Sequence, residues 1–452
     1  MINIEKGRIR NSEAINSWKK WGPYVSDRQW GTVREDYSKD GSAWEYFPHD
    51  MARSRAYRWS EDGIAGICDD QQHICFALAF WNYKDPIIKE RFFGLTGNEG
   101  NHGEDVKEYF YYQDSTPTHS YMRMMYRYPH DEFPYNQLVT ENKSRGRADD
   151  EFDLIDSGIF DNNKFFDIYI EYAKNDKEDI LVRIEIANKY HEDKELVVLP
   201  TVWFRNTWDW DHGSTKPSLY SITDNEIRLA HHDFGTYNLY LDQHPELLFC
   251  ENETNTKHVF GQDNGKSYFK DGINNYIVDG EKIAVNPANV GTKAAGAYRI
   301  NVAANNNYII RLRLSKEKIN APFENFDNLV VQRKSEADIF YSDLQAHIRE
   351  DDLKNIQRQA YAGMMWAKQY YNFDVSKWLD GDEINPPFID FDINRKHGRN
   401  STWRHMHCSE IISMPDKWEY PWFAAWDLAF HCIPIARIDP SFAKDQLQLL
   451  LD

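Results

Sequence analysis

The chain of 452 residues is too long for one ordinary hydrophobic core, so its length indicates two or three domains. A formal net charge of −19 disfavours nucleic acid as a partner, because binding to phosphates relies on lysine and arginine. Aromatic residues make up 15% of the chain, and many rings beside a surplus of carboxylates suit a neutral ligand such as a sugar.

Several common classes of site and segment are absent from the sequence. The five cysteines form no CxxC pair or Cys/His zinc spacing, which indicates free thiols in a reducing compartment and no structural metal. No GxGxxG or Walker-type loop occurs, so no cofactor is expected. The first residues lack the apolar core of a secretory signal, and the longest apolar run, ICFALAFW at 74–81, is shorter than the roughly 20 residues that cross a bilayer. We therefore expect a cytoplasmic protein without a membrane partner; the pattern does not indicate an oligomeric state.

Up to about residue 315 the pattern predicts mostly β-structure. Segments 165–173, 180–190 and 196–208 are rich in β-branched and aromatic residues, which favours strands. Residues 296–315 predict a hairpin, with an asparagine-rich turn at 305–307. Several strands without a long helical pattern between them predict a large antiparallel β-sandwich over residues 1–318.

The pattern becomes helical after about residue 320. Residues 319–349 predict a helical linker, and residues 351–373 predict a helix with one apolar stripe. The stripe consists of Ile356, Ala360, Met364, Ala367 and Tyr371. The rest of the chain is expected to be all-α. Its last helix has Asp439 as the predicted N-cap and Pro440 at the first helical position, and its apolar stripe suggests that the protein continues beyond Asp452.

Residues 414–431, MPDKWEYPWFAAWDLAFH, place five aromatic residues around one acid, Asp427. A carboxyl group flanked by tryptophan is partly desolvated, which favours its protonated form. A protonated carboxyl group is what a glycosidase uses to donate a proton to the departing glycosidic oxygen. The alternative is that Asp427 caps or pairs within a helix while the rings belong to the core, and the pattern alone leaves both interpretations open.

Long blocks of the chain resemble the bacterial and fungal branch of glycoside hydrolase family 63. They are SDRQWGTVREDYS (26–38), AWEYFPHDMARSRAYRWSEDGIAGICD (43–69), RFFGLTGNEGNHGEDVKEYFYYQDSTPTHSYM (91–122), LPTVWFRNTWDW (199–210) and KWEYPWFAAWDLAFH (417–431). The family contains processing mannosyl-oligosaccharide glucosidase and soluble bacterial α-glucosidase-like proteins. The resemblance implies a multidomain β + α fold, with a β-sandwich followed by an (α/α)6 barrel whose first part would occupy residues 350–452.

The resemblance also implies an activity and a catalytic residue. It implies inverting cleavage of an α-glucosidic bond in an oligosaccharide or small glycoside, without a cofactor. The family's general acid, an Asp in a Trp-Asp segment, falls on Asp427. The family's general base lies much later in the barrel, and no segment of this chain matches it.

The residues near the acid are candidates for binding the sugar. Trp418, Tyr420, Trp422 and Trp426 are expected as walls of the sugar subsites, and Lys417 and Glu419 as hydrogen-bonding partners of hydroxyl groups. We expect two or three of these six to touch the sugar and the others to face the core. The loop at 398–403 adds Arg399, Asn400 and Trp403, although a capped loop packed on the sandwich is an equal interpretation.

The remaining motifs leave alternatives open. The segment GNEGNHGEDVKEY (97–109) has His102, Glu104, Asp105 and Glu108, but their spacing is not a zinc spacing, and its glycines predict a tight loop that packs against the barrel or rims its mouth. A non-catalytic carbohydrate-binding protein is the second functional hypothesis. A glycoside phosphorylase is the third, and it would require cationic or backbone N–H donors for phosphate.

Overall fold

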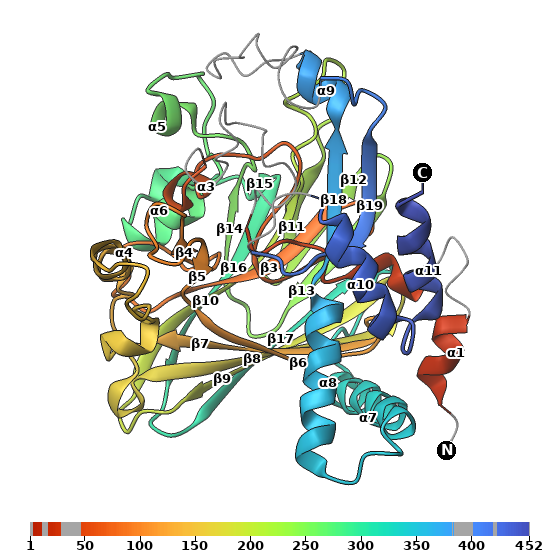
Figure 1. Ribbon diagram of the computed structural model, residues 1–452. Helices are drawn as coiled ribbons and strands as arrows, with labels where there is room; N and C mark the ends of the chain where they lie inside the picture. Colours follow the sequence, from red (N-terminus) through yellow and green to blue (C-terminus); the bar gives the residue numbers. More distant parts are fainter. Residues whose placement is uncertain are drawn as a thin grey trace.

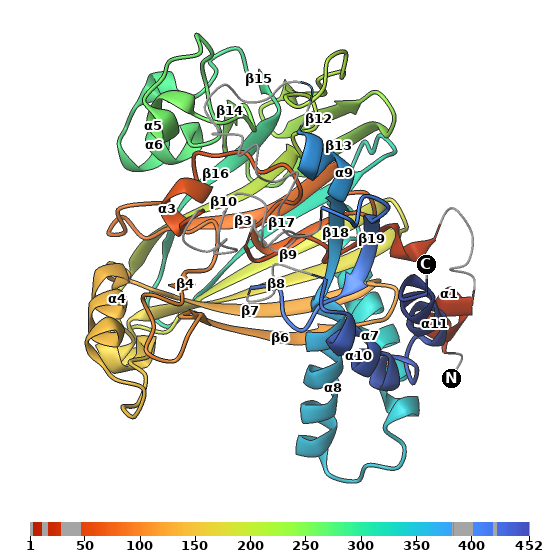
Figure 2. The same ribbon diagram turned by 45° about the horizontal axis from the view of Figure 1, so that its top comes forward.

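The computed structural model describes residues 3–10, 17–28, 47–381, 383, 401–418 and 423–451. Two antiparallel sheets pack face to face (Figure 1). Helices α7 (Phe326–Leu344), α8 (Asp351–Trp366), α10 (Ala425–Ile435) and α11 (Pro440–Leu449) gather on one side of these sheets, where α1 (Ile4–Arg10) also lies (Figures 1 and 2).

Within the described residues the first sheet has six strands, in the order β1-β2-β3-β10-β16-β14. These strands are β1 (Trp21–Gly22), β2 (Ile64–Asp69), β3 (Ile74–Trp81), β10 (Lys194–Phe204), β16 (Lys293–Val302) and β14 (Glu246–Cys250). The second sheet, counted over the same residues, has nine strands, in the order β15-β11-β12-β13-β17-β9-β8-β7-β6. These are β15 (Val290–Gly291), β11 (Ser218–Thr223), β12 (Glu226–His231), β13 (Gly235–Leu241), β17 (Asn307–Ser315), β9 (Asp179–Asn188), β8 (Phe165–Asp176), β7 (Tyr121–Pro129) and β6 (Tyr109–Ser115).

Short elements occupy the connections between these strands. They are η1 (Trp18–Lys20), α3 (His49–Ala52), β4 (Gly94–Leu95), β5 (Asp105–Val106), α4 (Tyr135–Ser144), η2 (Leu154–Ser157), η3 (Asp161–Asn163), α5 (Thr256–Phe260), α6 (Gly272–Val278) and η4 (Lys282–Ala284). The strands predicted at 165–173, 180–190 and 196–208 are confirmed as β8, β9 and β10.

The core lies between the two sheets because their strands alternate in side-chain direction. In β17, Ile310, Leu312 and Leu314 are buried in this core, whereas Arg311 and Arg313 point to the opposite face. Arg313 is itself buried and pairs with Asp179 at 2.6 Å. The predicted antiparallel sandwich therefore follows from the period-two pattern of its strands.

The hairpin predicted at 296–315 is wrong in its pairing. β16 pairs with β10 and β14 in the first sheet, whereas β17 pairs with β9 and β13 in the second. The asparagine-rich turn is present, but the chain crosses there from one sheet to the other. Because both strands bury an apolar face in the same core, their sequence pattern does not reveal which neighbour each one binds.

The region after residue 320 combines helices with a further small sheet. α7 follows the sandwich and contacts β7 and β8. α8 packs on β6, where the indole of Trp366 stacks on Tyr112 with ring centroids 5.1 Å apart. Chain segments from both ends share a second core, which includes Phe47, Tyr57 and residues of α10 and α11.

The helix predicted at 351–373 ends earlier than expected. α8 ends at Trp366, and β18 (Lys368–Asp374) then pairs with β19 (His407–Ser413), so the rest of the chain is not all-α. The predicted stripe is also wrong, since Ile356 is 56% exposed and the buried face carries Tyr361, Met365 and Trp366. The aromatic run in β18 favours a strand once β19 supplies a partner.

The last helices agree better with the sequence. Asp439 caps α11, with its carboxylate accepting a hydrogen bond from the amide of Phe442, and Pro440 occupies the first turn. α9 (Val375–Asp380) and α10 complete the helices of the described region. The β + α composition is thus confirmed, while the (α/α)6 barrel and the domain limits at 318 and 349 stay predictions. Among the described residues, no helix is both long and apolar enough to cross a bilayer.

We predict that Gly94→Ala destabilises the protein by about 1–3 kcal/mol. A methyl group at this position would overlap with the indole of Trp418 and with the backbone carbonyl of Asp105. The matched control is Gly363→Ala in α8, where no atom lies within 4 Å of the added carbon. This control should stabilise the chain by about 0.5–1 kcal/mol. Urea unfolding would measure both changes, and equal midpoints for the two variants would contradict the packing of Trp418 described here.

Candidate functional site

Asp427 lies in the first turn of α10 and is half-buried. Among the described residues, no ion pair or hydrogen bond occupies its carboxylate. No described side chain therefore competes with a ligand for this carboxyl group.

Asp427 interacts electrostatically with His431, one helical turn later. Burial lowers the pKa of His431, and the charge of Asp427 partly opposes this shift. The Nδ1 atom of His431 shares a hydrogen bond of 3.0 Å with the hydroxyl of Ser413, at the end of β19. The acid thus sits beside an imidazole whose orientation is held by the neighbouring strand.

The rings near Asp427 do not enclose it in the described part of the chain. Trp426 is 76% exposed and contacts Phe430, with ring centroids 5.4 Å apart, while Phe423 packs on Tyr371. The predicted subsite residues Glu419, Tyr420 and Trp422 lie outside the described residues. The role of Trp426 as a subsite wall stays a prediction.

Lys417 is buried and joins its own segment to the N-terminal segment that contains Pro23 and Val25. Its ammonium group donates to the carbonyl oxygens of Pro23 and Val25, the second at 2.9 Å. Burial lowers the pKa of Lys417 to about 8, although the nearby Asp27 opposes the shift. These contacts favour a structural role, and contact of Lys417 with a sugar hydroxyl stays a prediction.

Asp27 is the buried acid that faces Lys417. Burial raises the pKa of Asp27 to about 6, against the opposing effects of Lys417 and of a 3.1 Å hydrogen bond from the hydroxyl of Tyr112. The pair connects the N-terminal segment with the segment that leads to α10. The spacing of the two residues along the chain gave no signal for this contact.

Trp418 is a buried packing residue in this structure. Its indole lies against Gly94, which has no side chain in the way, and the guanidinium group of Arg28 lies 3.5 Å from the ring centroid. Neither face of the ring is open to solvent, because the residue is only 3% exposed. Stacking of Trp418 on a sugar stays a prediction.

The second predicted loop is separated from Asp427 by a whole strand. Arg399 and Asn400 lie outside the described residues. Trp403 is 55% exposed and precedes the start of β19, whereas Ser413, beside α10, is the end of that strand. The structure therefore does not bring Trp403 next to the acid.

The loop at 97–109 packs on the segment after α4. His102 bonds to the carbonyl of Asp149 at 2.9 Å, and Lys107 pairs with Asp105 and Asp153 at 2.6 and 3.1 Å. The ammonium group of Lys107 already supplies a cation to this acidic cluster, which also includes Glu151. A metal ion would have to displace it.

His231, His232 and Asp233 form a second group with ligand atoms close enough for a metal ion. The Nδ1 atom of His231 accepts hydrogen bonds from the amides of Asp233 and Phe234 at 3.3 and 3.2 Å. This atom is then occupied, and a neutral imidazole carries its proton on the other nitrogen. The donor set therefore does not fit a metal ion in this conformation.

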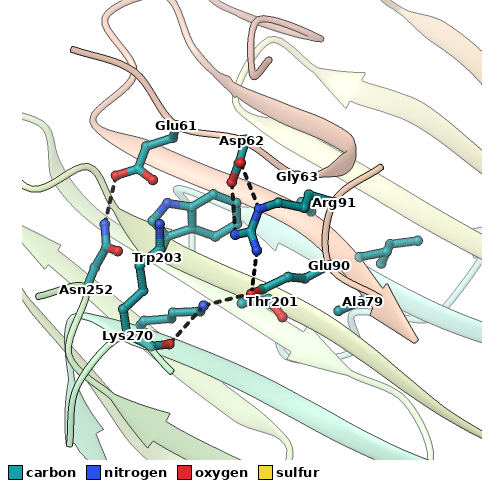
Figure 3. Close-up of a pocket in the computed structure, with 13 residues that line it drawn as sticks. Glu61, Asp62, Gly63, Ala79, Glu90, Arg91, Thr201, Trp203, Asn252 and Lys270 are labelled. Carbon is teal, nitrogen blue, oxygen red and sulfur yellow. Dashed lines mark hydrogen bonds and ion pairs between the residues drawn. The ribbon is translucent and has the colours of Figure 1, made fainter. Parts of the chain in front are cut away.

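A small chamber of charged residues lies where the segment just before β2 meets β3, β10, β16 and the loops that carry Arg91, Asn252 and Lys270 (Figure 3). Asp62 binds Arg91 through two contacts of 2.9 and 3.3 Å, and Glu90 lies 3.0 Å from Arg91. Glu90 also pairs with Lys293 at 3.3 Å. Burial opposes the ionisation of Glu90, but Lys293 and Arg91 lower its pKa to about 2.

Glu61 and Lys270 complete this chamber. Burial raises the pKa of Glu61 and lowers that of Lys270 to about 8, so both shifts favour the neutral forms. Asn252 donates to Glu61 at 2.8 Å, but its own side-chain oxygen is buried without a hydrogen-bond partner among the described residues. The cavity is about 20 Å³, which is space for about one water molecule.

The charged residues of the chamber connect several segments of the fold, and the cavity between them is too small for a sugar. A single water molecule would satisfy the oxygen of Asn252. Sequence reasoning missed this cluster, because its acids and bases come from four separate segments and none of them forms a motif by itself.

Comparison with known proteins gives one strong sequence match. A protein of Saccharomyces cerevisiae, described only as uncharacterized, is 41% identical over 498 residues. The match covers 99% of this chain, which spans 45% of the length of that relative. No family model matches the chain.

Similarity to solved structures is weak. A family GH92 alpha-mannosidase from Bacteroides thetaiotaomicron matches with a TM-score of 0.27 and 8% identity, over 80% of this chain and 42% of that one. A protein described as a kojibiose phosphorylase from the human microbiome matches with a TM-score of 0.20 and 10% identity, over 79% and 41%. At these scores the likeness establishes neither a common fold nor a common activity.

The Asp27–Lys417 pair generates a prediction about pH. Unfolded Asp27 loses its proton near its ordinary pKa of 3.8, whereas the folded chain holds it to about pH 6. The stability that Asp27 contributes is therefore complete below the unfolded value and is lost as the pH rises through the folded value. In Asp27→Asn this titration is absent.

The free energy of unfolding of the native chain relative to Asp27→Asn should fall by about 2–3 kcal/mol between about pH 4 and about pH 7. Urea unfolding at several pH values would measure the difference. Parallel pH curves for the two proteins would exclude a raised pKa of Asp27.

Proposed function

We propose that the chain provides the β-sandwich and the first catalytic helices of a glycoside hydrolase related to family 63. The reaction is inverting cleavage of an α-glucosidic bond in an oligosaccharide or small glycoside. The observation that carries the proposal is the carboxyl group of Asp427, which is half-buried in the first turn of α10 and free of ion pairing among the described residues. The family resemblance assigns the general acid to the same position.

In the proposed reaction Asp427 donates its proton to the departing glycosidic oxygen as the bond to the sugar breaks. An inverting enzyme also needs a general base on the opposite face of the sugar, with the two carboxyl groups roughly 6.5–9.5 Å apart and a water molecule between them. One carboxyl group cannot perform both tasks. We assign the base to a segment outside this chain.

The exposed face of α10 supports this division. Trp426, Phe430 and Ile433 are 76%, 56% and 69% exposed and lie on successive turns of the helix. An apolar stripe of this kind is usually covered by another element. Further helices packed on this stripe would exclude water from the neighbourhood of the acid.

We predict that the 452-residue chain alone has no appreciable glycosidase turnover, because no segment of it matches the family's general base. The measurement is hydrolysis of an aryl α-glucoside by the purified chain. Turnover that Asp427→Asn abolishes would overturn the assignment of the base to another segment.

In the product of the complete reading frame, Asp427→Asn should lower kcat for a natural α-glucoside by about 10²–10⁴. The matched control is Asp445→Asn, the same substitution at an exposed position of the next helix. α-Glucosyl fluoride needs no protonation of its leaving group, so Asp427→Asn should retain most activity on this substrate.

Three other outcomes would contradict the proposal. An equal loss of activity on both substrates would exclude Asp427 as the general acid. Turnover that depends on inorganic phosphate would identify a phosphorylase. Binding of glucosides by the complete protein without any turnover would identify a carbohydrate-binding protein.

A further inference from the structure

An open cleft is lined by residues of α3, β4 and the start of α4. These elements lie on the side of the sandwich away from α10 (Figures 1 and 2). Its volume is about 700 Å³. This is within the range of roughly 300–1,000 Å³ that is typical of sites for small organic ligands. The lining includes no residue of α10, so the cleft is distinct from the proposed acid.

One wall of the cleft is a cluster of rings. The rings of Phe93 and Tyr135 lie 5.0 Å apart between centroids, Phe133 and Tyr135 lie 4.6 Å apart, and His49 and Phe93 lie 5.3 Å apart. The Phe93–Tyr135 and His49–Phe93 pairs are edge to face, and the Phe133–Tyr135 pair is tilted. The wall therefore offers a packed aromatic surface to a ligand.

Two of the acidic groups around the cleft already have partners. Asp50 pairs with Arg53 at 2.6 Å, and Glu99 accepts a hydrogen bond of 3.0 Å from the amide of Thr96. Behind the rings, the ammonium group of Lys89 pairs with Glu108 at 2.7 Å. A charged ligand would have to compete with these contacts, which favours an uncharged one.

Two neutral polar atoms of the lining residues have no hydrogen-bond partner among the described residues. They are Nε2 of His49 and the hydroxyl oxygen of Tyr135, and both are buried. Burial, with Arg91 and Lys89 adding to it, lowers the pKa of His49 well below its ordinary value, so the imidazole is neutral. A buried polar atom without a partner costs about 1–3 kcal/mol. A hydroxyl group can satisfy both atoms, because it donates and accepts.

We propose that this cleft binds a neutral oligosaccharide, with the ring cluster under a sugar and with His49 and Tyr135 bonded to its hydroxyl groups. The site is a second binding site that does not take part in bond cleavage. Both polar atoms have almost no exposed surface, so the side chains of His49 and Tyr135 must rotate slightly before a ligand can bond to them. The free energy of this rotation reduces the affinity for the ligand. The proposal of this cleft does not depend on the proposed function. Only the choice of an α-glucan, maltotriose, as the first probe rests on it.

The test measures binding to the purified chain by saturation-transfer NMR and calorimetry. The probes are the neutral trisaccharides maltotriose and mannotriose, and the anionic trigalacturonate. A neutral trisaccharide should bind, and Tyr135→Phe should weaken its binding at least tenfold. The matched control is Tyr111→Phe on β6, a partly exposed tyrosine that does not line the cleft. Asp427→Asn should leave this binding unchanged.

The melting temperature of each variant separates loss of binding from loss of fold. Tyr135→Phe removes a buried hydroxyl without a partner, so its melting temperature should stay equal or rise while the binding weakens. His49→Gln provides a second variant with the same expected loss of binding.

Several results would overturn the cleft as a sugar site. These are binding that both cleft variants leave intact, binding of the anionic probe alone, no binding of a neutral probe, or binding that Asp427→Asn abolishes. Failure of the proposed function is separate, because it is a lack of hydrolysis by the complete protein. Hydrolysis without cleft binding, or cleft binding without hydrolysis, would remove one proposal and leave the other.

Discussion

The structure depends on the requirement that a buried charge has a partner. Several buried ion pairs join segments that lie far apart in the sequence, and the N-terminal segment takes part in some of them. Examples are Arg8–Glu336 at 2.6 Å and Lys19–Asp439 at 2.7 Å. Asp27, in the same segment, interacts electrostatically with the buried Lys417. Removal of one partner from such a pair leaves an uncompensated buried charge, which costs about 3–5 kcal/mol. The N-terminal segment therefore holds the sandwich and the later helices in one arrangement.

This requirement also divides the aromatic and charged residues of the motif at 414–431. Lys417 and Trp418 are buried and bind the segment to the sandwich, through the carbonyls of Pro23 and Val25 and through Gly94. Trp426 is exposed on α10 beside Asp427. The first residues of the motif thus position the helix, and the later ones present the acid. A motif rich in tryptophan can serve both purposes within a few residues.

The chamber at Arg91 and the cleft at His49 differ in how the hydrogen-bonding needs of their polar groups are met. In the small chamber, three carboxylates meet three cations, and the space is about 20 Å³. In the open cleft Asp50 pairs with Arg53 as well, but neutral polar atoms of His49 and Tyr135 lack partners among the described residues. The paired charges of the chamber already have their interactions within the fold. The unpaired polar atoms beside the large cleft would gain hydrogen bonds when a ligand binds, and this gain favours binding. The cleft is for this reason the better candidate for binding.

The sequence by itself determined the features that depend on local pattern. Period-two alternation predicted β8, β9 and β10, and the Asp-Pro pair predicted the start of α11, because these signals act between residues that are close along the chain. Only the tertiary structure decided which sheet β17 joins, where α8 ends, and that Lys417 binds carbonyl groups at the other end of the chain. The cleft at His49 and Tyr135 was also invisible in the sequence. Each of these depends on contacts between distant segments, and a strand or a buried charge carries no local mark of the partner that satisfies it.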